Sequence, residues 1–293
     1  MLGHKVFQVF NSEFETHASF LGHAEYVSAF PVYRDVPSSR IHLGVNVLEE
    51  KPLEDLINSV KPEVVLNCIG LIKQLEEASN NILAIKMNSL LPHRLAQLCE
   101  RANARLVHIS TDCVFSGRKG NYKESDPPDA LDLYGKSKAL GEVDYAPHLT
   151  IRTSIIGREW VRSTALLEWF LSQKGNAVRG YRNTVYTGLT TEAFAGVALQ
   201  AVTERPDLAG LWQVSSEPVT KLELLTRIRD AWKLDIEIEP YDDPPCDRSL
   251  DSSRFFNETG FARPSWESMI SGLVNDDLPY EEWRERNRRL LSK

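Results

Sequence analysis

The amino-acid sequence predicts an α/β protein built on a doubly wound parallel sheet, with a smaller C-terminal lobe. The stretches "EVVLNCIGLI" (63–72) and "ARLVHIST" (104–111) are nearly continuous apolar runs rich in β-branched residues, as in strands covered on both faces. Between them, residues 80–103 place apolar side chains at helical spacing. "LTIRTSIIG" (149–157) predicts a further buried strand. Strand, helix and strand in this order form a right-handed crossover in a parallel sheet.

The N-terminal elements are expected to follow the same alternation. "MLGHKVFQVF" (1–10) has a glycine followed by apolar periodicity, which is typical of a turn entering a helix. "AEYVSAF" (24–30) predicts a strand, and "LEDLINSV" (53–60) predicts a short helix that ends before Pro62. Pro92 lies inside the helical pattern of the crossover, so we expect a kink or a restart of the helix there.

The second half of the chain alternates less regularly. A strand is expected to end near Val214, and a helix is expected to begin after Thr220, because Thr220 and Glu223 have the spacing of a capping box. Residues 238–255 are rich in Pro, Asp and Ser and predict a long loop. The tail, residues 280–293, predicts a charged helix with a solvated basic end.

Composition and charge exclude several classes of protein. The 34 Lys and Arg residues are outnumbered by 41 Asp and Glu, which gives a net charge of -7 and argues against a nucleic-acid partner. No apolar run approaches the ~20 residues of a membrane span, and no secretory signal is visible. The four cysteines are scattered and read as reduced thiols, so a cytoplasmic protein without a structural metal is expected: Cys68, Cys99, Cys113 and Cys246.

One pair of residues suggests acid–base chemistry. Tyr134 and Lys138 are four apart in a segment that looks helical, so they share a helix face. A neighbouring ammonium favours the phenolate and is expected to lower the pKa of the tyrosine, which suits a proton donor to a carbonyl oxygen. The hydroxyl of Ser110 or Thr111, at the end of a predicted strand, could hold that oxygen. By itself the pattern is weak, since Tyr and Lys are common on helix surfaces.

The surrounding motifs make the pattern specific. "STDCVF", then Y-x-E-x-D-x-P, then "LYGKSKALGE" follow one another, flanked by "VVLNCIG", "IRTSIIG", "GLTTEAFAG", "GLWQVSS" and "SLDSSRF". In order and spacing the sequence resembles the extended short-chain dehydrogenase/reductases, and within them the dTDP-4-dehydrorhamnose reductase group. The resemblance covers nearly the whole chain. By contrast, no Gly-x-Ser-x-Gly elbow of a serine hydrolase and no HExxH-type metal motif is present.

The resemblance implies a catalytic triad and a division of the chain. The triad falls on Thr111, Tyr134 and Lys138: Tyr134 would protonate a keto oxygen, Lys138 would hold the nicotinamide ribose, and Thr111 would orient the carbonyl. Residues 1–157 would form a Rossmann-like dinucleotide-binding domain. Residues 158–293 would form mainly a substrate-binding lobe, with some segments returning to the sheet.

The resemblance also implies a nicotinamide cofactor and its binding residues. These are expected to be Leu2, Gly3, Arg34, Asn46, Val47, Cys68, Ile69 and Gly70, together with Tyr134 and Lys138. Arg34 follows the predicted strand 24–30 and could pair with a ribose 2′-phosphate, which predicts NADPH over NADH. The alternatives left open are a surface charge for Arg34, a buried thiol for Cys68, and NAD as cofactor.

The expected substrate is a nucleotide sugar. The implied substrate-binding residues are Asp112, Cys113, Arg152, Thr187 and Arg248. An arginine fork suits a nucleotide diphosphate because it makes two charge-assisted bonds, although surface placement of Arg248 stays open. Cys113 stands where the family usually has Tyr, which leaves the identity of the sugar open. A homodimer is also left open.

The N-terminus departs from the family pattern. "MLG" matches only the last three positions of the family's Gly-x-x-Gly-x-x-Gly turn, and Gly3 would be its third glycine. We expect "MLG" to be the remnant of such a turn, with the first strand and two glycines missing. Adding a strand and turn of about ten residues is expected to raise both the melting temperature and the NADPH affinity.

Three functions follow as hypotheses. The first is NADPH-dependent reduction of a 4-keto nucleotide-activated deoxysugar in deoxysugar or surface-polysaccharide biosynthesis. The second is a non-catalytic regulatory subunit of the same fold that binds a nucleotide sugar or a dinucleotide. The third is a nucleotide-sugar epimerase or dehydratase, because these families share the triad.

Overall fold

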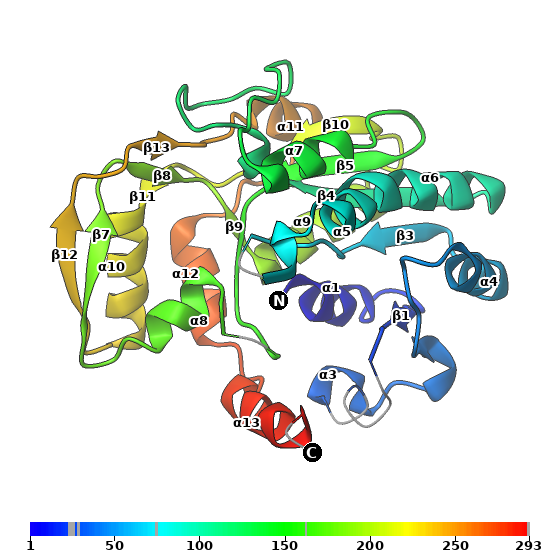
Figure 1. Cartoon of the computed structure of the whole chain (residues 1–293), viewed down its shortest axis with the longest axis horizontal. Helices are drawn as coiled ribbons and strands as arrows, with labels where there is room; N and C mark the ends of the chain where they lie inside the picture. Colours follow the sequence, from blue (N-terminus) through cyan, green and yellow to red (C-terminus); the bar gives the residue numbers. More distant parts are fainter. Residues whose placement is uncertain (23–26, 28–29, 74–75, 162, 292–293) are drawn as a thin grey trace.

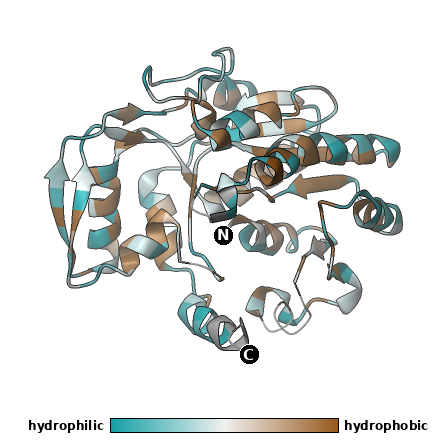
Figure 2. Cartoon of the chain, in the orientation of Figure 1, coloured by the Kyte–Doolittle hydropathy of each residue, from teal (hydrophilic) through white to brown (hydrophobic). Residues whose placement is uncertain are grey.

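A parallel sheet with flanking helices forms the centre of the molecule, which confirms the predicted α/β class (Figure 1). The computed structural model describes residues 1–22, 27, 30–73, 76–161 and 163–291. The central sheet has four parallel strands in the order β10-β5-β4-β3. Their bounds are β3 Val64–Asn67, β4 Arg105–Thr111, β5 Leu149–Thr153 and β10 Gly210–Gln213. β3 is hydrophobic along most of its length, as a covered strand requires (Figure 2).

The later part of the crossover from β3 to β4, from Glu76 to Arg101, consists of consecutive helical elements. It comprises the 3₁₀ turn η2 (Glu76–Ser79), α5 (Asn81–Ala84), the π-helical turn η3 (Ile85–Leu90) and α6 (Leu91–Arg101). Pro92 is the second residue of α6, which follows the π-helical turn η3 directly, with Leu90 and Leu91 in the right-handed helical conformation. The helix therefore continues through Pro92 with a change from π-helical to α-helical hydrogen bonding, and does not restart there.

The helix predicted at the start of the chain is confirmed, and further elements precede β3. α1 (Leu2–Phe10) packs on α9 (Thr191–Thr203), and a separate parallel pair is formed by β1 (Ala18–Ser19) and β2 (Ile41–His42). A strand was expected at 24–30, a stretch that lies largely outside the described residues.

Arg34 is the last residue of the short helix α3 (Pro31–Arg34), which the 3₁₀ turn η1 (Ser38–Arg40) follows. Helix α4 (Glu50–Val60) confirms the helix predicted before Pro62 and ends at a left-handed Lys61.

The second half of the chain adds small sheets and helices. Thr220 and Glu223 form both hydrogen bonds of the predicted capping box, at the start of α10 (Lys221–Trp232). α10 covers the parallel pair β7 (Ala177–Tyr181) and β12 (Glu237–Tyr241). The other elements are β6 (Ile155–Ile156), α8 (Leu166–Leu171), β8 (Thr184–Tyr186), β9 (Leu189–Thr190), β11 (Val219–Thr220), β13 (Cys246–Asp247), α11 (Ser253–Thr259) and α12 (Trp266–Val274).

One prediction for this half is wrong in part. Residues 238–255 are not one loop, because they contain most of β12 and all of β13, and each of these pairs with a strand from earlier in the chain. The helix predicted for the C-terminal tail is confirmed as α13 (Tyr280–Leu291), and its residues are largely hydrophilic (Figure 2). Its Tyr280 and Trp283 are buried in an aromatic cluster with Phe30 and Trp160. Within the described residues, no helix is long and apolar enough to cross a membrane.

Candidate active site

The site lies at the carboxyl edge of the central sheet, where open α/β sheets bind ligands. Thr111 is the last residue of β4. Its hydroxyl accepts from the Cys113 amide at 3.1 Å and thereby starts the 3₁₀ turn η4 (Asp112–Val114). The same hydroxyl donates to Asp112 Oδ1 at 3.1 Å.

Tyr134 and Lys138 face this edge from α7 (Leu133–Leu140). The Asp132 side chain caps α7 by accepting from the Gly135 amide at 2.7 Å. A Cβ at Gly135 would lie 2.2 Å from the Cys113 carbonyl oxygen, so only glycine lets α7 approach η4 this closely. Lys138 Nζ donates to the Ile109 carbonyl oxygen of β4 at 2.7 Å. The structure thus brings the three expected triad residues together.

Burial is the main influence on the pKa values of Tyr134 and Lys138. Burial raises the pKa of Tyr134, Cys113 raises it further, and a hydrogen bond with Thr111 opposes the change. The predicted lowering of this pKa is therefore wrong in direction, because burial removes the phenol from water and so disfavours the charged phenolate. Burial also lowers the pKa of Lys138 to about 8, opposed by Glu142. Tyr134 is consequently a protonated phenol at neutral pH, as a proton donor must be.

The loop after β3 lies beside the triad and is held by a residue that sequence reasoning missed. Asn88, on the π-helical turn η3, accepts from the Leu71 amide at 2.8 Å and donates to the Leu71 carbonyl at 3.0 Å. It also donates to the Ser137 hydroxyl of α7 at 3.1 Å. Asn88 therefore joins the loop Cys68–Gly70 to the helix of the triad. A buried asparagine inside an apolar helical pattern was the signal that could have found it.

The start of α1 contacts the same loop. A Cβ at Gly3 would be 3.7 Å from the Cys68 Cβ, an ordinary contact, so Gly3 lies against Cys68. Leu2, next to it, is partly buried against the main hydrophobic core. Burial raises the pKa of Cys68 to about 12, which makes it a packed thiol. Ile69 and Gly70 are exposed and remain available to a ligand.

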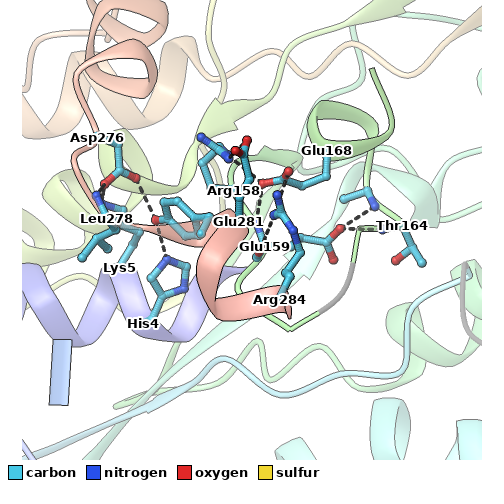
Figure 3. Close-up of polar contacts among 12 residues, drawn as sticks. His4, Lys5, Arg158, Glu159, Thr164, Glu168, Asp276, Leu278, Glu281 and Arg284 are labelled. Atoms are coloured by element: carbon cyan, nitrogen blue, oxygen red, sulfur yellow. Dashed lines mark hydrogen bonds and ion pairs between the residues drawn. The ribbon is translucent and has the colours of Figure 1, made fainter. Parts of the chain in front are cut away.

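Two buried carboxylates lie near the N-terminus of α1 (Figure 3). Glu159 accepts from the Thr164 and Ala165 amides, both at 2.7 Å. Glu168 pairs with Arg158 at 2.7 Å and with Arg284 of α13 at 2.8 Å. Helix N-termini attract anions, and in Rossmann domains this one receives the diphosphate.

Further contacts bind the C-terminal helix to α1 (Figure 3). Lys5 pairs with Asp276 at 2.8 Å, and Tyr280 donates to Asp276 at 2.7 Å while lying 2.9 Å from a His4 ring nitrogen. The expected cofactor residues Ile69 and Gly70 are thus exposed beside the triad, whereas the buried carboxylates of Glu159 and Glu168 lie near the N-terminus of α1.

The remaining expected cofactor residues lie on the β1/β2 side of the molecule. Arg34 is exposed on α3, which packs on α1, and it has no carboxylate within ion-pair distance in the described part of the chain. Asn46 donates to Glu49 at 2.7 Å and accepts from the Leu48 amide at 3.1 Å, which shapes the turn before α4. Val47 is partly buried beside the core that α4 covers.

A cavity of about 600 Å³ opens beside α7. Its lining comes from three stretches and one separate residue: 115–118, 130–132, 245–248 and Asn183. Arg248 lies in this lining and its Nε donates to the Phe115 carbonyl at 2.8 Å. Within the described residues no carboxylate lies within ion-pair distance of Arg248, so its charge is available to an anionic ligand.

Asp112 and Cys113 lie between the triad and a second lysine that sequence reasoning missed. Burial raises the pKa of Asp112, while Arg248 and Lys221 act to lower it. Burial, assisted by Asp112, raises the pKa of Cys113 to about 12. Lys221 opens α10 with its ammonium 5.6 Å from the Tyr186 ring centre. A lysine at a helix N-terminus opposes the helix dipole, which was the local signal for a role beyond the helix.

Arg152 and Thr187 lie in the packed interior. Arg152, 2% exposed, makes two bonds of 2.7 Å to Glu142, which also accepts from the Ser110 hydroxyl at 2.6 Å. Thr187, 1% exposed, accepts from the Leu250 amide at 3.3 Å. The structure therefore offers Arg248, and not Arg152, as the cation for a diphosphate. It also leaves Thr111, and not Ser110, as the hydroxyl beside Tyr134.

The chain matches a known protein family over most of its length. The family model described as "RmlD substrate binding domain" matches residues 31–277. Methionine adenosyltransferase 2 subunit beta of Danio rerio is 29% identical over 211 residues, which are 66% of this chain and 62% of that protein. A dTDP-4-dehydrorhamnose reductase of Aggregatibacter actinomycetemcomitans is 38% identical over 90 residues, 30% of each chain. The chain thus spans less than two thirds of the length of these relatives.

Solved structures share the fold. A hypothetical dTDP-4-dehydrorhamnose reductase from Sulfolobus tokodaii has a TM-score of 0.71 at 25% identity, covering 86% of this chain and 89% of its own. The Bordetella bronchiseptica enzyme WbmG, solved with NAD and UDP, has a TM-score of 0.74 at 18% identity, covering 98% and 91%. The Bacillus anthracis dTDP-4-dehydrorhamnose reductase, solved with NADP, has a TM-score of 0.70 at 17% identity, covering 82% and 92%.

Proposed function

This chain belongs to the RmlD substrate binding domain family, and on that premise we propose that it is an NADPH-dependent reductase of a 4-keto nucleotide-activated deoxysugar. The observation that carries the proposal is the convergence of Thr111, Tyr134 and Lys138 at one sheet edge, beside a cavity lined by Arg248, which has no ion-pair partner among the described residues. The product would be a deoxysugar nucleotide, of use in surface-polysaccharide synthesis.

Each triad residue would have its own role in the reaction. A bound reduced nicotinamide supplies the hydride that adds to the carbonyl carbon. Tyr134 donates its phenolic proton to the carbonyl oxygen, which requires the protonated phenol that burial favours. Thr111, hydrogen-bonded with Tyr134, holds the phenolic oxygen in place. Lys138, one helical turn away, provides positive charge to offset the phenolate that is left behind.

Other residues would bind the two ligands. The loop Cys68–Gly70 and Lys138 would hold the nicotinamide ribose, and Arg34 would favour NADPH by meeting a 2′-phosphate. Arg248 would pair with the nucleotide diphosphate, because its fork makes two charge-assisted bonds. Asp112 and Cys113, which follow Thr111 in η4, would contact the sugar.

The test is turnover of a panel of dTDP- and UDP-linked 4-keto sugars with NADPH and with NADH. Oxidation of the nicotinamide together with formation of a 4-hydroxy sugar is the expected result, faster with NADPH. Product analysis separates reduction from epimerisation and dehydration, which leave no net oxidised nicotinamide. Absence of turnover for every sugar, in protein that binds NADPH, would remove the reductase proposal.

A second function is favoured by two specific observations. Relatives named methionine adenosyltransferase 2 subunit beta match the chain, and the N-terminus of α1 lies beside the buried carboxylates of Glu159 and Glu168, which disfavour a diphosphate. The chain would then be a non-catalytic regulatory subunit of a methionine adenosyltransferase. Nicotinamide fluorescence unchanged by the protein, together with co-elution with a methionine adenosyltransferase catalytic subunit, would favour this function over the reductase.

A further inference from the structure

His108 is a buried residue next to Lys138 that neither the sequence motif nor the proposed mechanism uses. It lies in the middle of β4 with its side chain fully buried. Its Nε2 is 3.5 Å from Lys138 Nζ, and its Nδ1 is 3.1 Å from the Asn67 side-chain nitrogen. The imidazole therefore connects the end of β3 to the lysine of the triad.

The backbone fixes the direction of these contacts. The Ile69 amide donates to Asn67 Oδ1 at 3.1 Å. A backbone N–H can only donate, so the oxygen of the Asn67 amide must face Ile69 and its NH₂ must face His108. His108 Nδ1 is consequently an acceptor and carries no proton.

The proton of the neutral imidazole is then on Nε2, the nitrogen that faces Lys138. Burial and the charge of Lys138 lower the pKa of His108, so the ring is neutral. An N–H on Nε2 can be accepted by the lone pair of a neutral amine, but it repels an ammonium. His93 is the other titratable group that acts on His108, and Glu142 is the group whose charge favours the Lys138 ammonium.

We propose that His108 is a positioning residue that decides whether Lys138 is an amine or an ammonium, and that the Ile69 amide controls it through Asn67. When Ile69 donates to Asn67, the imidazole presents a donor and favours the amine. When the loop Cys68–Gly70 moves and releases Asn67, the Asn67 amide turns over, Nδ1 takes the proton, and Nε2 accepts from the Lys138 ammonium. The loop that would hold the cofactor is thereby coupled to the charge that offsets the Tyr134 phenolate. The catalytic role of this coupling rests on the proposed function, whereas the positions of the protons on the His108 ring do not depend on it.

The first experiment measures the tautomer directly. Nitrogen NMR of the labelled imidazole, assigned with His108→Gln, should show Nε2 protonated and Nδ1 unprotonated between pH 6 and 9. A proton on Nδ1 in the unliganded protein would overturn the proposal. The measurement needs neither substrate nor turnover, so its outcome is independent of whether the chain is a reductase.

A second experiment moves the proton. In Asn67→Asp the side chain is acceptor-only and can accept from both Ile69 and His108, so the imidazole proton should move to Nδ1. The titration of Lys138, followed by NMR of labelled lysines and assigned with Lys138→Met, should then move upward by about one pH unit. Asn80→Asp is the matched control, because it adds the same charge at an exposed helix cap and keeps that cap.

A double variant separates the tautomer from the added charge. In Asn67→Asp/His108→Leu the carboxylate remains but the imidazole is absent. The rise in the titration midpoint of Lys138 should therefore be less than half of the rise seen in Asn67→Asp alone. An equal move in the single and double variants would show that charge alone is responsible and would overturn the role of His108.

Discussion

The phenolic oxygen of Tyr134 is the smallest group on which the proposed chemistry depends. Tyr134→Phe removes it and keeps the ring, so turnover is expected to fall by ~100-fold or more, the usual effect of losing a positioned general acid. NADPH binding should persist, as measured by nicotinamide fluorescence. Tyr241→Phe, in the C-terminal lobe, is the matched control and should leave turnover unchanged. Near-normal turnover in Tyr134→Phe would contradict the mechanism.

Lys138 gives a pH-dependent prediction. Its folded-state pKa of about 8 lies below its ordinary value of 10.5, so below pH 8 the folded protein carries a buried ammonium at full cost. Lys138→Met should therefore be more stable than the wild type at pH 7, by up to about 3 kcal/mol. The difference should shrink between pH 8 and 10.5, where the folded wild type has lost its proton and the unfolded chain has not.

Urea unfolding of both proteins across this pH range measures the difference. A gap in the free energy of unfolding that stays constant from pH 7 to 10.5 would show that Lys138 is not destabilised by burial in the folded protein.

Arg248 is the residue on which the substrate assignment depends. Arg248→Ala should raise the Michaelis constant for a nucleotide sugar about tenfold or more, with a smaller change in kcat, since a charge-assisted pair contributes roughly 1.5–3 kcal/mol. Arg182→Ala removes an exposed arginine whose partner is Asp242 and serves as the control. If the Michaelis constant of every accepted sugar is unchanged in Arg248→Ala, the diphosphate is bound elsewhere.

Among the elements, the approach of α7 to η4 assembles the site. Gly135→Ala would place a Cβ 2.2 Å from a backbone carbonyl oxygen of η4, so the variant should lose roughly 2 kcal/mol or more of stability, as for other overpacked positions, together with activity. Gly196→Ala, inside α9 with nothing within 4 Å of the added Cβ, should instead gain roughly 0.5–1 kcal/mol. Thermal unfolding of Gly135→Ala and Gly196→Ala measures whether the first variant loses stability and the second gains it. Loss of stability in both variants would contradict the packing argument.

The elements also show where sequence patterns succeeded. The buried strands β3, β4 and β5, the capping box of α10 and the helical spacing of Tyr134 and Lys138 all depend on residues close in sequence, and each was predicted. The loop predicted at 238–255 was wrong in part, because β12 and β13 exist only by pairing with strands from earlier in the chain. Composition alone could not indicate that pairing.

In the whole molecule, buried ion pairs connect the C-terminal helix to the segment beside α1. Glu168→Gln removes the buried carboxylate that Arg158 and Arg284 share and leaves Arg158 only the exposed Glu281 at 3.7 Å, so it should cost about 3–5 kcal/mol of stability. Hydrogen exchange in α13 should accelerate as well. Glu258→Gln, which breaks an exposed pair with Arg254, should cost at most about 0.5 kcal/mol. Equal losses in the two variants would contradict the assignment of the cluster as a buried connection.

The sequence by itself determined the α/β class, the buried strands of the central sheet and the helix between β3 and β4. These depend on periodicity, capping and spacing, which act over a few residues and can be recognised in one chain. The expectation that Thr111, Tyr134 and Lys138 form a triad came from the family resemblance, because their spacing alone is weak. Only the tertiary structure decided which charged side chains are ion-paired within the protein and which face a cavity. Arg152 is paired with Glu142 while Arg248 faces the cavity, the pKa of Tyr134 is raised and not lowered, and His108 meets Lys138. Burial and long-range contacts set these properties, because the energy of a charge depends on what surrounds it in space.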